Sequence, residues 1–456
     1  MATFIADWLE SCRRKDLDTH DSVAWVKLNC GLAGLVADAY SSASPQGRPP
    51  AYDRLSMTMA LLYMQPEAIP NFEALARRLR GDDAFAERCG FGPAQRRPHG
   101  WDLRRHFRRL TAREFGKRLQ AALVAKAQSL GLLTTDSVAV DSTPIHTRQR
   151  WRKNAAPTAG MSASERSVHC DAQARQRRKD VYELPYTQLV DQLPRSAGWG
   201  QKTNSRGQVE RWFGYKLHIA VDCGPCEIPL AAIFTSADCH DHVVAYPLAI
   251  GVRERLGRSY RYGVYDSAYD AIDLYKFHDH HGEQMLGALN WRGNKPPPGL
   301  DRDCHPQCIM GRQHRYHSHD AAHRTLRFGL PADCPGPYCA LWERCREREI
   351  RVAQTDPRRH ICPPRGSETF KRLYARRSTI ERVNAGIKEH GRADACLLKQ
   401  SSPTEAWVDL SLAIWTAKKI VTALKSKQRG RPPKRPRRLR PQQLRLDRHA
   451  IGLGST

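Results

Sequence analysis

The chain has 456 residues, with 74 Lys and Arg against 47 Asp and Glu and a formal net charge of +27. It is too long for one ordinary domain, so we expect two or three lobes, and 40% hydrophobic residues suffice for a substantial core. The positive charge favours a polyanionic partner, because no basic amphipathic helix stands apart from the folded regions to suggest a membrane surface.

The N-terminal sequence MATFIADWLESCRRKDLD lacks the basic and then apolar layout of a signal peptide. No stretch approaches the ~18 apolar residues of a membrane span. We therefore expect a cytoplasmic protein with no membrane partner. In that compartment the 14 cysteines are expected to be free thiols or metal ligands and not disulfides.

Residues 1–132 are predicted to form a helical N-terminal DNA-binding domain. Helical apolar spacing covers Asn71–Leu79, with Gly81 as its exit, and recurs in Trp101–Leu110. Either these helices present solvated faces, or they bind DNA ends. The basic residues that leave both readings open are Arg77, Arg78, Arg80, Arg104, Arg105, Arg108 and Arg109.

Residues 133–290 are predicted to form the first part of an α/β core, with a polar insertion at about 151–211. A helix is expected over Ala268–His281. A hairpin turns at Gly224-Pro225. The strands are expected at Ser137–Val140, Trp212–Asp222, Glu227–Ser236, Arg261–Asp266 and Gln284–Asn290.

Two carboxylates stand where predicted strands end. Asp141 closes the first strand, and Asp266 closes a later one, with Ser267 placed to cap the next helix. Carboxylates at neighbouring strand ends can share two divalent ions that stabilise the entering and leaving oxygens of an in-line attack on phosphorus. Hard oxygen ligands favour Mg²⁺, or Mn²⁺ in its place. By spacing alone, several others have no better claim than capping turns: Asp136, Asp222, Asp241, Asp270 and Asp273.

A third carboxylate lies in residues 369–424, the predicted C-terminal helical part of the core, where a helix runs from Phe370 through Glu389. The spacing of Tyr374, Arg377, Glu381 and Lys388 places all four on one helical stripe. The stripe is too charged for a core face, although Arg377 and Glu381 could form an ordinary surface pair. Apolar residues on the opposite side would dock the helix and aim the stripe at a ligand: Ile380, Val383 and Ile387.

These motifs resemble the DDE transposases of bacterial insertion sequences, in particular the branch with the signature Tyr-x2-Arg-x3-Glu-x6-Lys, which the stripe meets in full. Further likeness lies in VAVDSTPI around Asp141, in GWGQKTNSRGQVERWFGYKLHIAVD and in VYDSAYD around Asp266. The resemblance spans roughly residues 50 to 424. In one departure, Ala268 stands where relatives usually have Gly, which would cost energy if that turn needs a positive φ.

The resemblance implies an RNase H-like core in which Asp141, Asp266 and Glu381 bind Mg²⁺ and carry out catalysis. It implies cleavage at insertion-sequence ends, followed by attack of the freed 3′-OH on target DNA. Arg377 and Lys388 would hold phosphates, assisted by Tyr374. A homodimer on double-stranded DNA, pairing two element ends, is expected in the bacterial cytoplasm, in association with the nucleoid.

Residues 291–368 are predicted to form a Cys/His-rich insertion with little periodicity. Structural zinc needs four N or S ligands, usually as two close pairs. Such pairs could come from Cys304 with Cys308 and from Cys334 with Cys339 or Cys345. This spacing is looser than paired Cys-x2-Cys motifs, so the alternative of free thiols in a loop stays open.

Residues 425–456 form a basic, Pro-rich tail. Arg429-Gly430-Arg431-Pro432 matches the core of an AT-hook, an extended segment that lies in the narrow A·T minor groove. Arg429 and Arg431 would then bind DNA. The alternative is a disordered solubilising tail.

The leading hypothesis is a Mg²⁺-dependent transposase. A nuclease that cuts without strand transfer would have the same fold. A zinc-containing DNA-binding regulator would explain the charge, the cysteines and the tail, but not the polar stripe.

Overall fold

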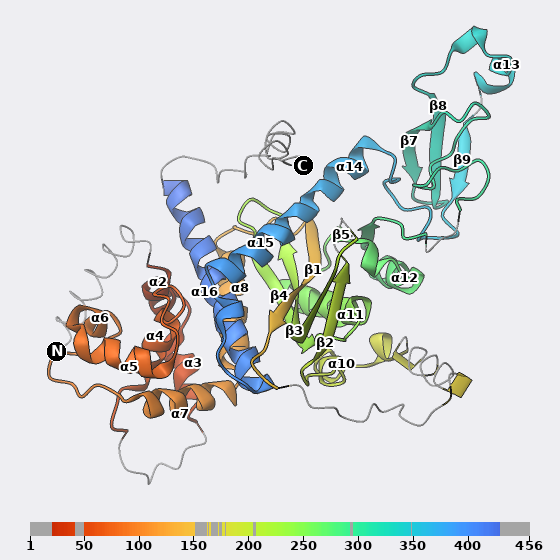
Figure 1. Ribbon diagram of the computed structural model, residues 1–456. Coiled ribbons are helices and arrows are strands. Elements are labelled where there is room, and N and C mark those ends of the chain that lie inside the picture. Colours follow the sequence, from red (N-terminus) through yellow and green to blue (C-terminus); the bar gives the residue numbers. More distant parts are fainter. Residues whose placement is uncertain are drawn as a thin grey trace, which may run out of the picture.

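The computed structural model describes residues 21–41, 50–150, 162, 164–165, 172, 176–177, 179–203, 207–291, 295–347 and 349–428. In this part of the chain, a group of N-terminal helices adjoins a six-stranded mixed sheet, and a three-stranded sheet lies apart from both (Figure 1). No described helix is long and apolar enough to cross a membrane.

The N-terminal helices confirm the two predicted from apolar spacing. Asn71 caps α5 by accepting a hydrogen bond of 2.8 Å from the backbone N–H of Ala74, and the helix ends at Gly81. All seven arginines of the two predicted helices are exposed. The helices are α2 (Ser22–Asn29), α3 (Leu32–Asp38), α4 (Arg54–Tyr63), α5 (Phe72–Gly81), α6 (Asp83–Arg88), α7 (Gly100–Thr111) and α8 (Phe115–Ser129).

The main sheet contains all of the predicted strands. It has the order β2-β3-β1-β5-β6, with β4 paired to β3. β1 runs antiparallel to β3 and parallel to β5, and β5 is parallel to β6. The strands are β1 (Ser137–His146), β2 (Gly198–Thr203), β3 (Val209–Asp222), β4 (Pro229–Ser236), β5 (Tyr262–Tyr265) and β6 (Gln284–Gly287).

Two strands differ from the prediction. β1 does not end at Asp141 but continues to His146, because β3 pairs with it along residues 138–146. Ser142-Thr143-Pro144 looks like a turn, yet β1 pairs with β5 only through residue 139, so Pro144 lies where one edge of the strand is open. β2 falls within the segment predicted as a polar insertion and pairs antiparallel with the first residues of β3.

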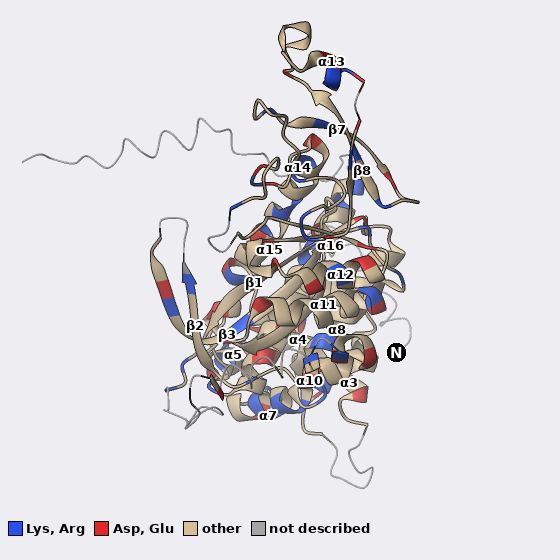
Figure 2. Ribbon diagram, turned by 90° about the vertical axis from the view of Figure 1, so that its right-hand side faces the viewer, with Lys and Arg blue, Asp and Glu red and all other residues tan. Residues whose placement is uncertain are grey.

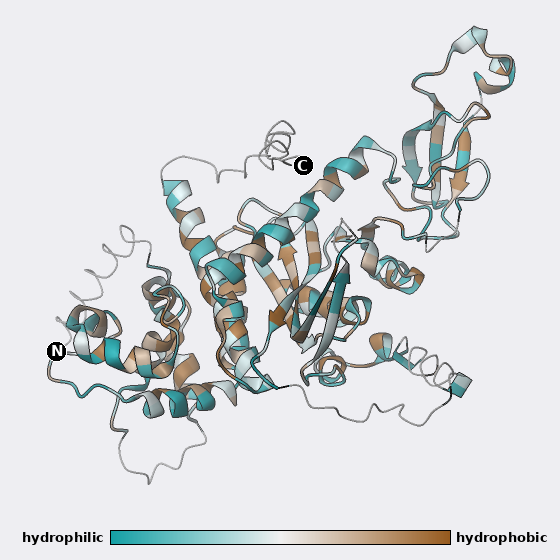
Figure 3. Ribbon diagram, in the orientation of Figure 1, coloured by the Kyte–Doolittle hydropathy of each residue, from teal (hydrophilic) through white to brown (hydrophobic). Residues whose placement is uncertain are grey.

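Helices cover both faces of the main sheet. α11 (Asp241–Leu256) packs against β3 and β4, while α15 (Ser378–Glu389) packs against β1 and β3. α12 (Ile272–His280) contacts β6. The long helix α16 (Ser401–Gln428) lies along α8 and α2 and so joins the core to the N-terminal helices. Apolar residues concentrate on these contacting surfaces (Figure 3).

The predicted Cys/His-rich segment contains regular structure that its irregular sequence did not reveal. Three antiparallel strands form the second sheet: β7 (His314–Asp320), β8 (Thr325–Pro331) and β9 (Ile350–Ala353). Leu326 and Phe328 of β8 are buried. The apolar alternation in β8 extends only over Leu326, Phe328 and Leu330, so the pattern was too brief to predict.

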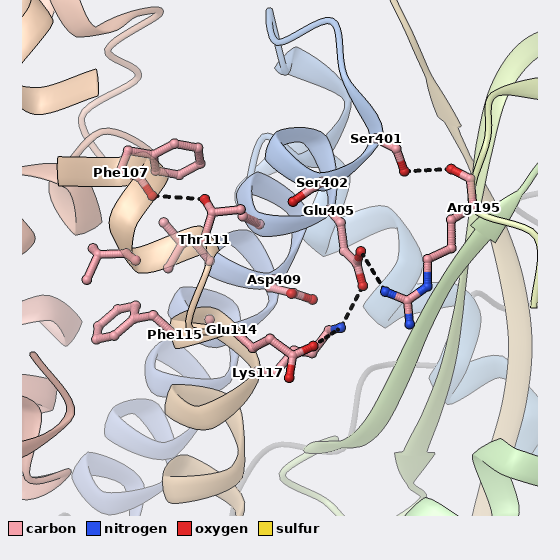
Figure 4. Close-up of a pocket in the computed structure, with 14 residues that line it drawn as sticks. Phe107, Thr111, Glu114, Phe115, Lys117, Arg195, Ser401, Ser402, Glu405 and Asp409 are labelled. Carbon is pink, nitrogen blue, oxygen red and sulfur yellow. Dashed lines mark hydrogen bonds and ion pairs between the residues drawn. The ribbon is translucent and has the colours of Figure 1, made fainter. Parts of the chain in front are cut away.

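A cavity of about 180 Å³ separates α7 and α8 from the start of α16 (Figure 4). Glu405 forms one ion pair with Lys117 at 2.7 Å and another with Arg195 at 3.7 Å. Asp409, one turn further along α16, is only 9% exposed. Burial and the nearby charge of Glu405 raise the pKa of Asp409 to about 7. The joint between the N-terminal helices and the core is therefore a buried, charged contact.

Candidate active site

The topology of the main sheet brings Asp141 and Asp266 together. Asp141 lies on β1 two residues after its last pair with β5, and Asp266 directly follows the end of β5. Because β1 and β5 are parallel neighbours, both carboxylates leave the sheet at the same place. Asp141 lies within β1, so the prediction that the strand ends there was wrong. The expected closeness of Asp141 and Asp266 is nevertheless present, because β1 and β5 are neighbours.

The two carboxylates share one electrostatic environment. Burial and the charge of Asp266 raise the pKa of Asp141 to about 6. Burial also raises the pKa of Asp266, and the charge of Asp241 adds to this effect. Arg377 and Lys202 act in the opposite direction on both groups. The site thus contains two buried carboxylates, and the nearby cations offset only part of the cost of ionising them.

Asp266 also caps the turn that follows it. Its side chain accepts a hydrogen bond of 2.8 Å from the backbone N–H of Ala268, at the start of the 3-10 turn η1 (Ser267–Tyr269). The predicted cap at Ser267 is therefore wrong, and α12 begins only at Ile272. Ala268 does not have a positive φ, so the departure from glycine causes no backbone strain.

α15 brings the predicted stripe to Asp141. Ile380, Val383 and Ile387 are fully buried and dock the helix. At about 100° per residue, this apolar face lies roughly a third of a turn from the stripe and not opposite to it. The stripe therefore runs along the border of the buried face. Asn384, which shares this border, donates a hydrogen bond of 3.3 Å to Asp141.

Glu381 lies on the stripe between two residues that act on Asp141. Arg377, four residues earlier, lowers the pKa of Asp141, and Asn384, three residues later, hydrogen-bonds to it. The side chain of Glu381 is 52% exposed and pairs with Arg377 at 2.5 Å. Among the residues described, no three Asp, Glu, His or Cys side chains gather as a metal site. Glu381 thus lies on the face of α15 that borders Asp141, but its carboxylate points to Arg377.

The rest of the stripe divides between the two ends of α15. The helix predicted from Phe370 is interrupted by the 3-10 turn η3 (Ala375–Arg377), which separates α14 (Glu368–Tyr374) from α15. The Tyr374 ring stacks on Phe370 at 5.2 Å, and burial raises the pKa of its hydroxyl, with the charge of Asp266 adding to this. Lys388, at the other end, pairs with Asp394 at 3.3 Å.

Three neighbours of the site were not predicted. Asn384 had no signal beyond its spacing from Glu381, and Lys202 lies in the segment predicted as an insertion. Asp241 was taken for a turn residue; it begins α11 and pairs with Lys216 at 2.9 Å. Its influence on Asp266 depends on a fold that places α11 beside η1, the turn that follows Asp266, and no local pattern encodes this.

The donor set at Asp141 and Asp266 suits a divalent metal ion. Both are carboxylates, which supply the hard oxygen ligands that Mg²⁺ prefers. Their pKa values are raised first by burial and then by the charge of a neighbouring carboxylate, Asp266 for Asp141 and Asp241 for Asp266. A bound cation would relieve the repulsion between these groups and would also attract a third carboxylate.

The cysteines predicted as zinc ligands do not form a site. Cys304 is buried, whereas Cys308, Cys334, Cys339 and Cys345 are part-exposed, and all five are free. No metal-type cluster of three or more residues occurs in the described ranges of the insertion. His305, which lies between the cysteines, packs on Phe328 and bonds the carbonyl of His314 at 2.5 Å. It therefore ties a loop to the small sheet. Arg429 and Arg431 of the predicted AT-hook lie outside the described residues.

Comparisons with known proteins identify the family of the core. A family model described as a transposase DDE domain matches residues 134–416. No curated protein matches the chain. A cryo-EM structure of a piggyBac transposase synaptic complex with hairpin DNA is similar, with a TM-score of 0.35 and 9% identity over 92% of this chain and 79% of that one. That likeness is too slight to carry an argument, whereas the family model covers more than half of the chain. The chain therefore belongs to the transposase DDE domain family.

Proposed function

We propose that this transposase acts on the ends of a bacterial insertion sequence and that Asp141, Asp266 and Glu381 are its catalytic metal ligands. Membership of the family gives the activity itself, metal-dependent cleavage and transfer of DNA strands. The proposal adds the element type and the residues. It also includes an RNase H-like core, for which the strand order β4-β3-β1-β5-β6 is the support.

The observation that carries the proposal is the pair of carboxylates at β1 and β5, bordered by the stripe of α15. The negative charge of Asp266 acts on Asp141, and Asn384 holds one carboxylate oxygen of Asp141 by a hydrogen bond. Glu381 would join them by turning about its side-chain bonds, away from Arg377. Its 52% exposure leaves room for that rotation.

The metal, with Mg²⁺ as the preferred ion, would supply Lewis acidity at phosphorus and a more acidic bound water. The chain itself would position the DNA. Arg377, once released by Glu381, would hold a phosphate beside the carboxylates, because a guanidinium matches phosphate oxygens in a bidentate manner. Tyr374 would support that phosphate from the Asp266 side, and Lys388 would hold the strand further along α15.

The remaining parts of the proposal concern the assembly. The exposed arginines on α5 and α7 support a helical DNA-binding domain within residues 1–132. We assign residues 133–290 and 369–424 to the catalytic core, 291–368 to an insertion and 425–456 to a basic tail with an AT-hook. A homodimer pairing two element ends, in the cytoplasm with the nucleoid, completes the proposal.

The test is cleavage of labelled duplex DNA that carries the repeats flanking the gene, with Mg²⁺ present. Wild type should nick the end, and Glu381→Ala should abolish nicking while DNA binding stays nearly intact. Glu389→Ala serves as the matched control, since Glu389 is the last residue of the same helix and lies off the stripe. Equal nicking by wild type and Glu381→Ala would defeat the assignment of Glu381.

A further inference from the structure

The first five residues of β3 and the whole of β2 form a two-stranded ribbon that extends beyond the pairs with β1 and β4. Residues 209–213 of β3 pair with β2, and the pairs with β1 and β4 begin at residues 214 and 215. The ribbon, defined as residues 198–203 and 209–213, is exposed at Trp199 and Val209, each 52% accessible. It is thus an appendage of the core.

The ribbon folds back along the sheet. Lys202 pairs with Glu210, nine residues along β3 from Ile219, which is the partner of Asp141. A straight strand would separate these positions by ~30 Å, at about 3.3 Å per residue. Figure 2 instead shows the ribbon rising to the left of β1 and not extending straight away from the sheet.

Gly214 permits this reversal. A Cβ at this position would lie 2.3 Å from the carbonyl oxygen of Ile145, so β1 and the bend of β3 approach more closely than any side chain allows. The neighbouring Gly200 is covered by the indole of Trp212, which is buried and donates a hydrogen bond of 3.2 Å to the carbonyl of Tyr215. The base of the ribbon is therefore fixed to the core.

Lys202 is the residue of the ribbon whose positive charge acts on Asp141 and Asp266. Its side chain is exposed, and it has no ion pair with any residue that the structure describes. Its charge lowers the pKa of both Asp141 and Asp266, as does that of Arg377 from α15. Arg211, one ladder position away, points to the other face of the ribbon, because successive residues of a strand alternate. It is not among the main charges that shift the pKa of either carboxylate.

We propose that Lys202 binds a backbone phosphate of the DNA strand held at Asp141 and Asp266, opposite the phosphate contact made by Arg377. This inference rests on the proposed function and names a further positioning residue for it. A lysine with no ion pair among the described residues can act as a point charge for phosphate, and two-stranded ribbons lie in the grooves of DNA in some DNA-binding proteins. The DNA strand would then be contacted by two elements of the protein, the ribbon and α15.

The experiment compares Lys202→Gln with Lys202→Arg and with Arg211→Gln, the control from the other face of the same ribbon. Binding of a labelled element-end duplex is measured without divalent metal over a range of salt concentrations, and cleavage is then measured with Mg²⁺. Loss of one phosphate contact should weaken binding by about tenfold and reduce the slope of log K against log salt by about one. Lys202→Arg should restore both, and Arg211→Gln should change neither.

Two further readouts distinguish the outcomes. The melting temperature of Lys202→Gln should equal that of wild type; if it falls while the salt slope is unchanged, Lys202 is only a counter-ion for the carboxylates and the proposal is overturned. Wild-type affinity and slope in Lys202→Gln would overturn it as well. If wild type itself fails to cleave with Mg²⁺, the proposed function fails, yet the binding comparison still decides the role of Lys202.

Discussion

Neutralising Asp409 should stabilise the protein above neutral pH. Asp409 lies in the cavity between α8 and α16, only 9% exposed, and burial together with the charge of Glu405 raises its pKa from 3.8 to about 7. Well below pH 4 the carboxyl is protonated in both folded and unfolded chains. As the pH rises from 4 to 7, the unfolded chain releases this proton while the folded chain retains it, so the free energy of unfolding falls.

The pKa values set the magnitude. Each unit of difference is worth about 1.4 kcal/mol, so a gap of about three units costs on the order of 4 kcal/mol once the pH exceeds 7. Asp409→Asn resembles the protonated carboxyl in shape and charge and removes this cost. Lys117 keeps its partners, because Glu405 and Glu114 lie 2.7 and 2.9 Å from its amine. The variant should therefore melt several degrees higher at pH 8 and equal wild type near pH 4.

The assay is thermal melting of both proteins in matched buffers from pH 4 to 8. Glu405→Gln is the control on the same helix, one turn earlier. Glu405 pairs with two cations, Lys117 and Arg195, so its neutralisation should lower the melting temperature at pH 8. The reasoning fails if Asp409→Asn and wild type melt alike at pH 8, or if the difference between them does not depend on pH.

Two further predictions follow from contacts at the sheet. Asn384→Ala should reduce strand cleavage about tenfold while DNA affinity is retained, because Asp141 loses the donor that fixes one of its oxygens at 3.3 Å; cleavage at the wild-type rate would contradict this. Gly214→Ala should cost a few kcal/mol of stability, since the new Cβ would lie 2.3 Å from the carbonyl oxygen of Ile145. Urea unfolding measures the effect. Gly131→Ala is the control: residue 131 has a positive φ, but a Cβ there would meet nothing within 4 Å, so this variant shows the cost of backbone strain without a steric clash.

Local patterns predicted most of the elements that surround the candidate site. The alternating and β-branched runs gave β3, β4 and β5, and the spacing from Tyr374 to Lys388 identified the helix face beside Asp141. These predictions worked because periodicity and turn residues act over a few positions. Asp141 was found through the short strand that precedes it, even though the predicted end of that strand was wrong.

The missing parts depend on contacts between distant segments. β2 has two glycines and little β-branched character, and it becomes a strand only because β3 pairs with it. Lys202 approaches the carboxylates because β3 reverses at Gly214, which a pattern of alternating residues does not reveal. The cysteine spacing was compatible with zinc, but the five thiols lie in segments outside the strands of the small sheet, and no metal site gathers them in the described part of the chain.

The orientation of Glu381 is the remaining link between the geometry and the reaction. Anomalous diffraction from a Mn²⁺-loaded complex with element-end DNA measures it directly, because it locates each cation and its ligands. We predict Mn²⁺ bound jointly by the side chains of residues 141, 266 and 381, with Arg377 turned to a DNA phosphate. Cations that sit elsewhere, or a Glu381 that still pairs with Arg377 while metal occupies the two aspartates alone, would contradict the account.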